Sequence, residues 1–308
     1  MNETHDGFIL LGFSEIPHFR LLLLFFFFIT YILCIAGNLF ISFLILLQHQ
    51  LHTPMYVLIG NLAMVDITFT SITIPRALYG LLSGDTYISF HGCLAQVFFF
   101  LAVGNMESYL LAIMAFDRYV AVCHPLRYIV IMKNRAIICL VASSWVIVSL
   151  HSTLYTVMSA THSYCSWDIY HFFCDLPVIM SLSCPDTVGT EQMIVFIEGT
   201  TFIFSPVLFI LGTYILIIRA VLKLCTSQGR RKTFSTCYSH LTMVILFYST
   251  VIFMYFRPSS FYSPTYDRVI SIVYSVIIPM LNPFIYSLRN KEIKSALRKM
   301  ISIRFHPN

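Results

Sequence analysis

The stretch Met114-Ala-Phe-Asp-Arg-Tyr-Val-Ala-Val-Cys-His-Pro-Leu126 decides how this chain is organised. It begins inside a long apolar run and ends near a proline, which indicates that a helix stops there. The adjacent charges Asp117 and Arg118 lie where the apolar run gives out. They must face water, pair with each other or face a protein interior, and the rest of the chain decides among these options.

The composition points to a membrane protein. The chain has 308 residues, of which 58% are hydrophobic and 11% charged, whereas a soluble domain carries about 25% charged residues. Irregular Pro and Gly content and the length of the apolar runs favour helices over barrel strands. We therefore expect an all-α membrane protein, a seven-transmembrane helix bundle, with membrane-spanning runs at about 21–47, 56–79, 94–122, 137–160, 191–222, 238–257 and 268–288.

The basic residues predict the orientation of the bundle. All but four of the 19 Lys and Arg residues lie in the link after the third run, in the link after the fifth run or in the tail. The exceptions are Arg20, Arg76, Arg257 and Arg268. The positive-inside rule then places residues 1–20 outside the cell and residues 289–308 in the cytosol, around a single receptor domain that spans 1–308. The net charge of +5 reflects this topology, and no nucleic-acid module is visible.

Both ends of the chain carry short motifs. Asn2-Glu3-Thr4 is a glycosylation sequon on the expected outer side. The first 20 residues show no cleavable signal peptide, so the first run is expected to act as its own anchor. Residues Asn290–Ile301 predict a short amphipathic helix on the inner leaflet, with the apolar positions Ile293, Ala296, Leu297 and Met300. At the start of the second run, Thr53 can cap the helix and Pro54 suits its first position.

Polar residues deep in the bundle suggest an internal site. Glu107 lies eleven residues before Arg118, roughly 16 Å along a helix, and Asp66 lies at a similar depth in the second run. Two carboxyl groups in one site either share a proton or hold a cation such as sodium. Asn38 and Asn282 can reach the same depth. Asn282 and water are expected to satisfy the carbonyl groups that Pro279 and Pro283 leave free.

Four cysteines, Cys93, Cys165, Cys174 and Cys184, fall on the expected outer side. An oxidising compartment favours disulfides, and four cysteines allow three pairings. A metal site competes, because His162-x-x-Cys165 and His171-x-x-Cys174 have ligand-like spacing.

The motifs together resemble one family, the olfactory (odorant) receptors within the rhodopsin-like G-protein-coupled receptors. The matching stretches are Phe8–Phe13, Leu51–Tyr56, Met114–Leu126, His171–Asp175, Phe234–His240 and Pro279–Asn290, which span nearly the whole chain in order. The outer pattern is similar to the terrestrial-vertebrate type (class II). The chain departs from the family pattern at Phe116, Thr233 and Ser249, none of which is a switch position.

The resemblance implies disulfide pairings and a plasma-membrane receptor. Cys93 would bond Cys174 and Cys165 would bond Cys184. Asp117 would hold Arg118 in the resting state, and activation would free Arg118 to meet a heterotrimeric G protein of the stimulatory olfactory type, which raises cyclic AMP. The implied activation switch consists of Asp117, Arg118, Tyr119, Tyr214, His240, Asn282, Pro283 and Tyr286. It lies next to the sodium and water network expected above from the positions of Asn38, Asp66, Glu107 and Asn282.

The family's ligand pocket lies in the outer half of the bundle. Counting along the runs from Arg118 and Pro206 predicts an aromatic and aliphatic cavity with a few polar groups, which suits a small, mostly apolar volatile. For most of these side chains ordinary helix packing explains their position equally well, but the acid Glu198 needs a partner. The expected lining is Phe100, Leu101, Gly104, Asn105, Ser108, Glu198, Phe202, Tyr248, Val251, Ile252, Tyr255, Tyr274 and Ser275.

Other functions are less consistent with the sequence. The runner-up is a class A receptor for a non-odorant small molecule or a peptide. Phe100 stands where aminergic receptors carry an aspartate, and no lysine lies between Asp267 and Ser287 to bind retinal. A membrane transporter would show paired inverted repeats. No G-x-S-x-G or H-E-x-x-H motif occurs, so we do not expect an enzyme.

Overall fold

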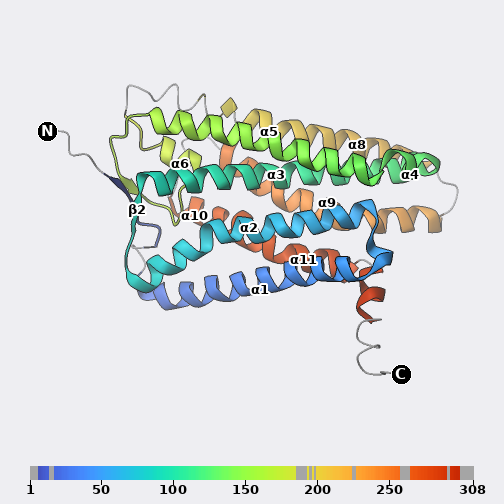
Figure 1. The fold of residues 1–308 in the computed structure, drawn as a ribbon, viewed down its shortest axis with the longest axis horizontal. Coiled ribbons are helices and arrows are strands. Elements are labelled where there is room, and N and C mark those ends of the chain that lie inside the picture. The colour runs from blue at the N-terminus through green and yellow to red at the C-terminus, as the bar shows by residue number, and fades with distance from the viewer. Residues whose placement is uncertain are drawn as a thin grey trace.

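Long helices run side by side along the molecule (Figure 1). The computed structural model describes residues 6–13, 17–184, 193, 196–197, 199–223, 227–256, 264–289 and 292–298. Within these residues, seven helical segments are long and apolar enough to cross a membrane. They are α1 (Arg20–Leu47), α2 (Pro54–Ser83), α3 (Phe90–Cys123), α5 (Asn134–Thr161), η5 (Thr200–Phe204) with α8 (Ser205–Leu222), α9 (Ser227–Phe256), and α10 (Pro264–Ile272) with η7 (Val273–Ile277) and α11 (Ile278–Arg289).

Most of the helices are longer than the apolar runs that predicted them. The helix α9 begins at Ser227, eleven residues before the expected start of the sixth run. A helix need not stop where its apolar residues stop, because its backbone groups remain hydrogen-bonded in the headgroup region and in water. The polar stretch before His240 is therefore helical.

Burial is arranged for a lipid surrounding. Large apolar side chains such as Leu21 and Leu46 of α1 are exposed by 70% and 73%. The helix α3 is the most enclosed of the seven and packs against α2, α5 and α8 (Figure 1). Because α3 carries Glu107 and Asp117, both carboxyl groups lie inside the protein, where each is at most 1% exposed.

The helix α2 begins and ends at residues suited to those places. Pro54 is its first residue and Thr53 is the N-cap residue, but the Thr53 side chain makes no capping hydrogen bond. At the other end Gly84 takes a φ of 77°, a left-handed conformation that glycine adopts without strain. The chain then turns into a short strand, β2 (Tyr87–Ser89).

A small sheet and a short helix cover one end of the bundle, which we call the outer end after the orientation expected from the sequence. The sheet has β1 (Gly7–Leu10) between β2 (Tyr87–Ser89), which is antiparallel to it, and β3 (Asp168–Ile169), which is parallel to it. The fully buried ring of Phe8 packs against those of Phe90, Tyr164 and Trp167. The helix α6 (Leu176–Met180) follows in the same loop.

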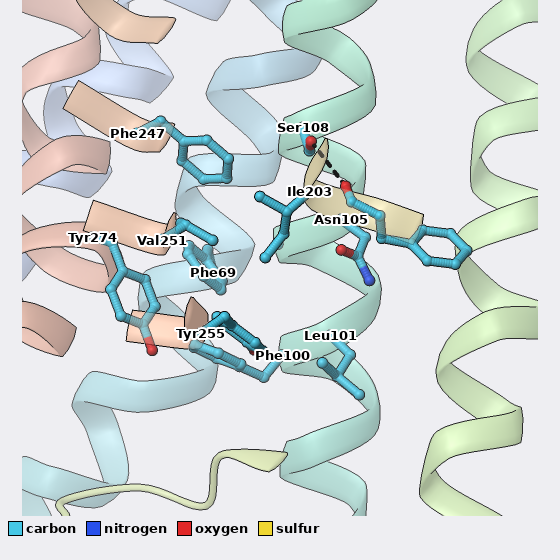
Figure 2. A pocket seen from close by; sticks show the side chains of 12 residues that line it. Phe69, Phe100, Leu101, Asn105, Ser108, Ile203, Phe247, Val251, Tyr255 and Tyr274 are labelled. Carbon is cyan, nitrogen blue, oxygen red and sulfur yellow. Dashed lines mark hydrogen bonds between the residues drawn. The ribbon is translucent and has the colours of Figure 1, made fainter. Parts of the chain in front are cut away.

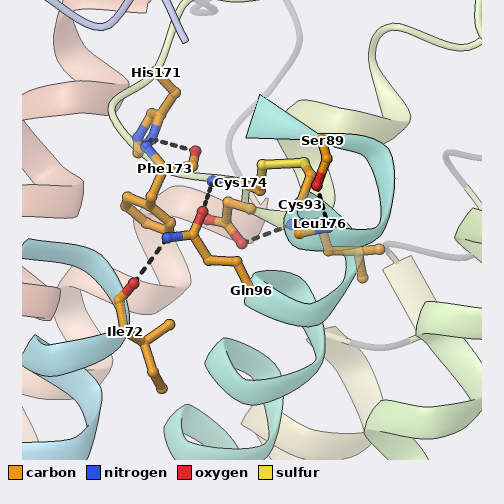
Figure 3. The surroundings of a disulfide bond; sticks show 10 residues. Ile72, Ser89, Cys93, Gln96, His171, Phe173, Cys174 and Leu176 are labelled. Atoms are coloured by element: carbon orange, nitrogen blue, oxygen red, sulfur yellow. Dashed lines mark hydrogen bonds between the residues drawn. A yellow bond between two sulfur atoms is a disulfide. The ribbon is translucent and has the colours of Figure 1, made fainter. Parts of the chain in front are cut away.

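Two disulfides fix the loop after α5. Cys93 at the start of α3 bonds Cys174, and Cys165 bonds Cys184. Gln96, one turn after Cys93, accepts a hydrogen bond from the Cys174 amide at 2.8 Å and donates one to the Ile72 carbonyl of α2 at 2.8 Å (Figure 3). The loop is thus held over the bundle both covalently and by a buried amide.

The opposite, inner end carries η3 (Pro125–Arg127), α4 (Tyr128–Ile131) and a helix over 292–298. The sequence predicted a short amphipathic helix here, and the structure has one. Its apolar positions Ile293 and Ala296 are fully buried in the core of the bundle, and Glu292 accepts a 2.7 Å hydrogen bond from Tyr56. Packing against the bundle removes these side chains from water without needing the membrane.

Candidate ligand cavity and switch

A cavity of about 40 Å³ lies between α2, α3, the η5 turn, α9 and η7, in the outer half of the bundle. Aromatic rings dominate its wall, and the side chains of Asn105, Ser108, Tyr255 and Tyr274 bring polar atoms to it (Figure 2). Its lining residues are Phe69, Phe100, Leu101, Gly104, Asn105, Ser108, Phe202, Ile203, Phe247, Val251, Tyr255 and Tyr274.

Most of the expected lining residues meet in this cavity, but some do not. Tyr248, Ile252 and Ser275 are not part of the wall. Tyr248 instead shares a 2.6 Å hydrogen bond with the Ser108 hydroxyl, and Ser275 donates to the Ser271 carbonyl of its own helix. Glu198 lies outside the residues that the structure describes.

Counting at an α-helical period missed three lining residues, Phe69, Ile203 and Phe247. Ile203 lies in η5, a π-helical turn, where the wider spacing shifts every side chain relative to an α-helix. Phe247 continues the row of Val251 and Tyr255 at four-residue spacing, while its neighbour Tyr248 turns towards α3. Phe69 lies one turn beyond Asp66, and a count along α2 would have found it.

Behind the cavity, Asn105 is tied to α5. Its Nδ2 lies 3.3 Å from Nδ1 of His151. Because an amide nitrogen only donates, Nδ1 of His151 accepts and its ring proton lies on Nε2. In Figure 2 the Asn105 oxygen points towards the cavity, whereas its nitrogen points away from it.

A buried polar network joins the outer loop to the cavity. Asp175 is fully buried, accepts a 2.8 Å hydrogen bond from the Leu176 amide and a 2.9 Å bond from the Tyr274 hydroxyl. Burial raises the pKa of Asp175 to about 7. His171 of the same loop lies 3.0 Å from the Ser271 hydroxyl, and burial lowers its pKa to about 3.

The polar residues predicted near the middle of the bundle separate into two groups. Asn282 donates to both carboxylate oxygens of Asp66, at 2.9 and 2.8 Å, and the Glu107 carboxyl is close enough to repel that of Asp66. Both oxygens of Glu107 are buried without a hydrogen-bond partner among the described residues. Asn38 instead donates to the carbonyl groups of Cys34 and Pro279. Asn282 and water were expected to satisfy the freed carbonyl groups. For the carbonyl group of Pro279 this expectation is wrong, because Asn38 donates to it.

At the inner end of α3, Asp117 faces Arg118 and Tyr128. Its Oδ2 lies 4.0 Å from Nε of Arg118, and its Oδ1 accepts a 2.7 Å hydrogen bond from the Tyr128 hydroxyl. Tyr119, two residues on, lies 3.1 Å from the His124 ring. The carboxylate is thus held from two sides, by the neighbouring guanidinium and by α4.

A second contact joins α3, α8 and α9. Nε2 of His240 lies 2.9 Å from the Leu111 carbonyl and therefore carries the proton, so Nδ1 accepts from the Tyr214 hydroxyl at 2.7 Å. The Tyr286 hydroxyl is buried without a partner among the described residues, and Pro283 of the same helix lies beside Gly37 of α1.

The metal site considered for the outer loop is not formed. Cys165 and Cys174 are bonded to Cys184 and Cys93, so neither sulfur is free to be a thiolate ligand. His162 lies 2.8 Å from the Met158 carbonyl and His171 faces Ser271. In the part of the chain that the structure describes, no group of three or more metal-binding side chains occurs.

Known proteins resemble this chain over nearly its whole length. A family model described as olfactory receptor matches residues 27–304. The human protein "Olfactory receptor 1L6" is 47% identical over 97% of this chain and 86% of its own length. The rat protein "Olfactory receptor 1f45" is 45% identical over 99% of both chains.

The solved structure of squid rhodopsin superimposes with a TM-score of 0.70, covering 93% of this chain and 86% of that one at 19% identity. That likeness shows the fold. The family and its fold define a multi-pass receptor of the plasma membrane and not an enzyme. The chain belongs to the olfactory receptor family of the rhodopsin-like G-protein-coupled receptors.

Proposed function

We propose that this receptor binds a small, mostly apolar volatile in the cavity of Figure 2 and activates a heterotrimeric G protein of the stimulatory olfactory type, which raises cyclic AMP. The observation that carries the ligand class is the wall of the cavity. It is largely aromatic and aliphatic, with Asn105 and Tyr255 among its few polar side chains. Such a wall favours an apolar body with one or two polar atoms.

The cavity of about 40 Å³ is small for an odorant. Binding therefore requires side chains of the wall to move apart, and its aromatic rings, among them those of Phe100 and Tyr255, are the largest groups that can move. A ligand that binds the receptor with a widened cavity more tightly than the receptor with a narrow one shifts the equilibrium towards the widened conformation. The predicted contact with Glu198 belongs to the same proposal.

The switch supports coupling at the inner end. Asp117 holds Arg118 in the resting state, and His240 holds Tyr214. On activation, Arg118 leaves Asp117 and meets Tyr214 and Tyr286, while the inner end opens to the G protein. The side chain of Leu126 is 98% exposed, and it is placed to contact that partner. The positive-inside pattern supports an extracellular N-terminus, with Asn2 glycosylated, and a cytosolic tail.

We further propose that Asp66 and Glu107 bind a sodium ion. The donors are oxygens, as a hard cation prefers, and the two Glu107 oxygens have no other partner among the described residues. The bound ion supplies one positive charge between the two buried carboxyl groups, which reduces their mutual repulsion.

The test is a cyclic AMP assay in cells that express the receptor at a measured surface level, run against a panel of odorants. We expect the receptor to respond to at least one volatile. The response should disappear in Arg118→Ala, and in Tyr255→Ala it should require a higher odorant concentration. An unchanged dose-response in Tyr255→Ala would show that the ligand does not bind in this cavity. Normal signalling by Arg118→Ala at equal surface level would contradict the switch.

A further inference from the structure

A second cavity of about 220 Å³ lies at the outer ends of α1 and α2, apart from the ligand cavity. The two cavities share no lining residue. The rings of Phe13 and Phe172, stacked 5.6 Å apart, form part of its wall, and Phe172 lies 5.6 Å from Phe27 beyond them. With Leu10, Ala77 and Leu81, these rings make the wall largely apolar.

Two guanidinium groups also line this cavity. Arg20 donates from Nε and Nη2 to the Leu81 and Leu82 carbonyl groups at the end of α2. Arg76 donates from Nη1 and Nη2 to the carbonyl groups of Asp85 and Tyr87. A guanidinium has five N–H groups, so each arginine keeps donors that these contacts do not use.

The charges at this place do not balance. Among the described residues, neither arginine forms an ion pair, and the acid in the wall is Asp85. The Asp85 carboxylate accepts a 3.0 Å hydrogen bond from the Tyr87 amide, and one negative charge faces two positive ones. Arg76 lies seven residues before the end of α2, roughly 10 Å inside a helix that spans the membrane. Its side chain extends towards the outer end, where the guanidinium meets the carbonyl groups of Asp85 and Tyr87 and lies 5.2 Å from the centre of the Tyr79 ring. These contacts hold the cation but do not neutralise its charge.

Two glycines keep the space beside the arginines open. A Cβ atom at Gly80 would lie 3.9 Å from Nη1 of Arg76, and one at Gly84 would lie 4.0 Å from Nη2 of Arg20. These positions are four residues apart, which in a helix places them about 5–6 Å from each other. Both guanidinium groups therefore border the same end of the cavity, beside the last turn of α2.

We propose that this second cavity binds an anionic amphiphile, whose carboxylate or phosphate lies between Arg20 and Arg76 and whose alkyl chain lies against Phe13, Ala77 and Phe172. The carbonyl contacts of the arginines explain how they are held at the end of α2. They do not explain an apolar space beside two cations, and an acid with an apolar chain matches both parts. The acid comes either from water, as a fatty acid, or from an anionic lipid of the outer leaflet.

The experiment measures the thermal midpoint of the purified full-length receptor in bilayer nanodiscs of neutral phosphatidylcholine. The first probe is octanoate, compared with octanol, which has the same chain without the charge. The second is a nanodisc that contains phosphatidylglycerol. The variants are Arg20→Gln, Arg76→Gln and Ala77→Leu, which fills the cavity but keeps both charges. Arg135→Gln, at the inner end, is the charge-matched control.

Octanoate is expected to raise the midpoint with increasing concentration through the second cavity, whereas any octanol shift arises from the ligand cavity and is the same in the wild type and the variants. The octanoate shift is lost in Arg20→Gln, Arg76→Gln and Ala77→Leu and is kept in Arg135→Gln. A shift with phosphatidylglycerol alone, lost in the same variants, assigns the acid to the lipid. No shift with either acid, an octanoate shift that persists in the three variants, or an octanol shift that these variants abolish would overturn the proposal. If the arginine variants do not fold, Ala77→Leu decides. Its lost octanoate shift supports the proposal, and a retained shift refutes it.

Discussion

The hydroxyl group of Tyr274 donates a 2.9 Å hydrogen bond to Oδ2 of Asp175, which joins the outer loop to the wall of the ligand cavity. Burial raises the pKa of Asp175 to about 7, and Asp267 nearby adds repulsion. The folded receptor thus keeps a proton on Asp175 at pH values where the unfolded chain has lost it. The contribution of Asp175 to stability is fully present below pH about 4 and is lost as the pH rises through about 7.

His171 works in the opposite direction. Burial and the charge of Arg268 lower its pKa to about 3, so its contribution is present above its usual pKa and is lost as the pH falls. The wild type and Asp175→Asn both contain His171, so its effect cancels in the difference between their thermal midpoints. We expect the thermal midpoint of the wild type, minus that of Asp175→Asn, to fall between pH 5 and pH 8. A difference that stays constant across this range would contradict the assignment.

The Asp66 and Glu107 pair gives a prediction about sodium. If the pair binds Na⁺, replacing choline chloride by sodium chloride at constant ionic strength raises the thermal midpoint of the purified receptor. Glu107→Gln should abolish this shift, because it removes one ligand charge and keeps the shape of the side chain. Asp175→Asn, in the outer loop, should keep it. Equal midpoints in both salts for the wild type would instead indicate that the two carboxyl groups share a proton.

The regular parts of the helices could be predicted from the sequence, and so could much of the ligand cavity. Phe100, Gly104 and Ser108 lie on one face of α3 at four-residue spacing, and the cavity contains all three. Counting residues at the α-helical period failed near the π-helical turns η5 and η7. Ile203 lines the cavity although it was not predicted, and Ser275 was predicted but does not line it. A π turn has no signature in hydrophobic periodicity, because it shifts the spacing by less than one residue per turn.

Contacts between distant parts of the chain could not be predicted either. The strand β1 is four residues long and depends on partners at residues 87–89 and 168–169. Asn38 satisfies the Pro279 carbonyl across 241 residues. The sequence around Asn38 does not show that it bonds this carbonyl group while Asn282 bonds Asp66, because both asparagines lie at the same depth in the bundle.

The contact between Tyr128 and Asp117 predicts a change in basal signalling. Tyr128→Phe removes the 2.7 Å hydrogen bond that holds Asp117 from the side of α4 and keeps the ring. A freer Asp117 holds Arg118 less firmly, so we expect higher cyclic AMP without odorant than in the wild type. The free-energy difference between the resting and active states should change by at most the value of one hydrogen bond to a charged group, about 1.5–3 kcal/mol. The measurement is basal cyclic AMP at equal surface expression, with Ile129→Ala on the same short helix as the control. Unchanged or lower basal activity in Tyr128→Phe would argue that Tyr128 is only a packing residue.

The contact between His151 and Asn105 predicts which odorants the receptor prefers. Since Nδ2 of Asn105 donates to His151, its oxygen is left to accept from a ligand, and a hydroxyl group can donate where a ketone cannot. We expect alcohols to be more potent than ketones of the same carbon skeleton. His151→Phe keeps a ring against Phe202 but frees the amide to turn, so the alcohol preference should shrink by roughly 3- to 10-fold, the worth of one hydrogen bond. Ser152→Ala, also buried on α5, is the matched control and should keep the preference. A wild-type preference for ketones would mean that the amide presents its nitrogen to the ligand, and equal losses for both ligand classes in His151→Phe would reduce His151 to a packing role.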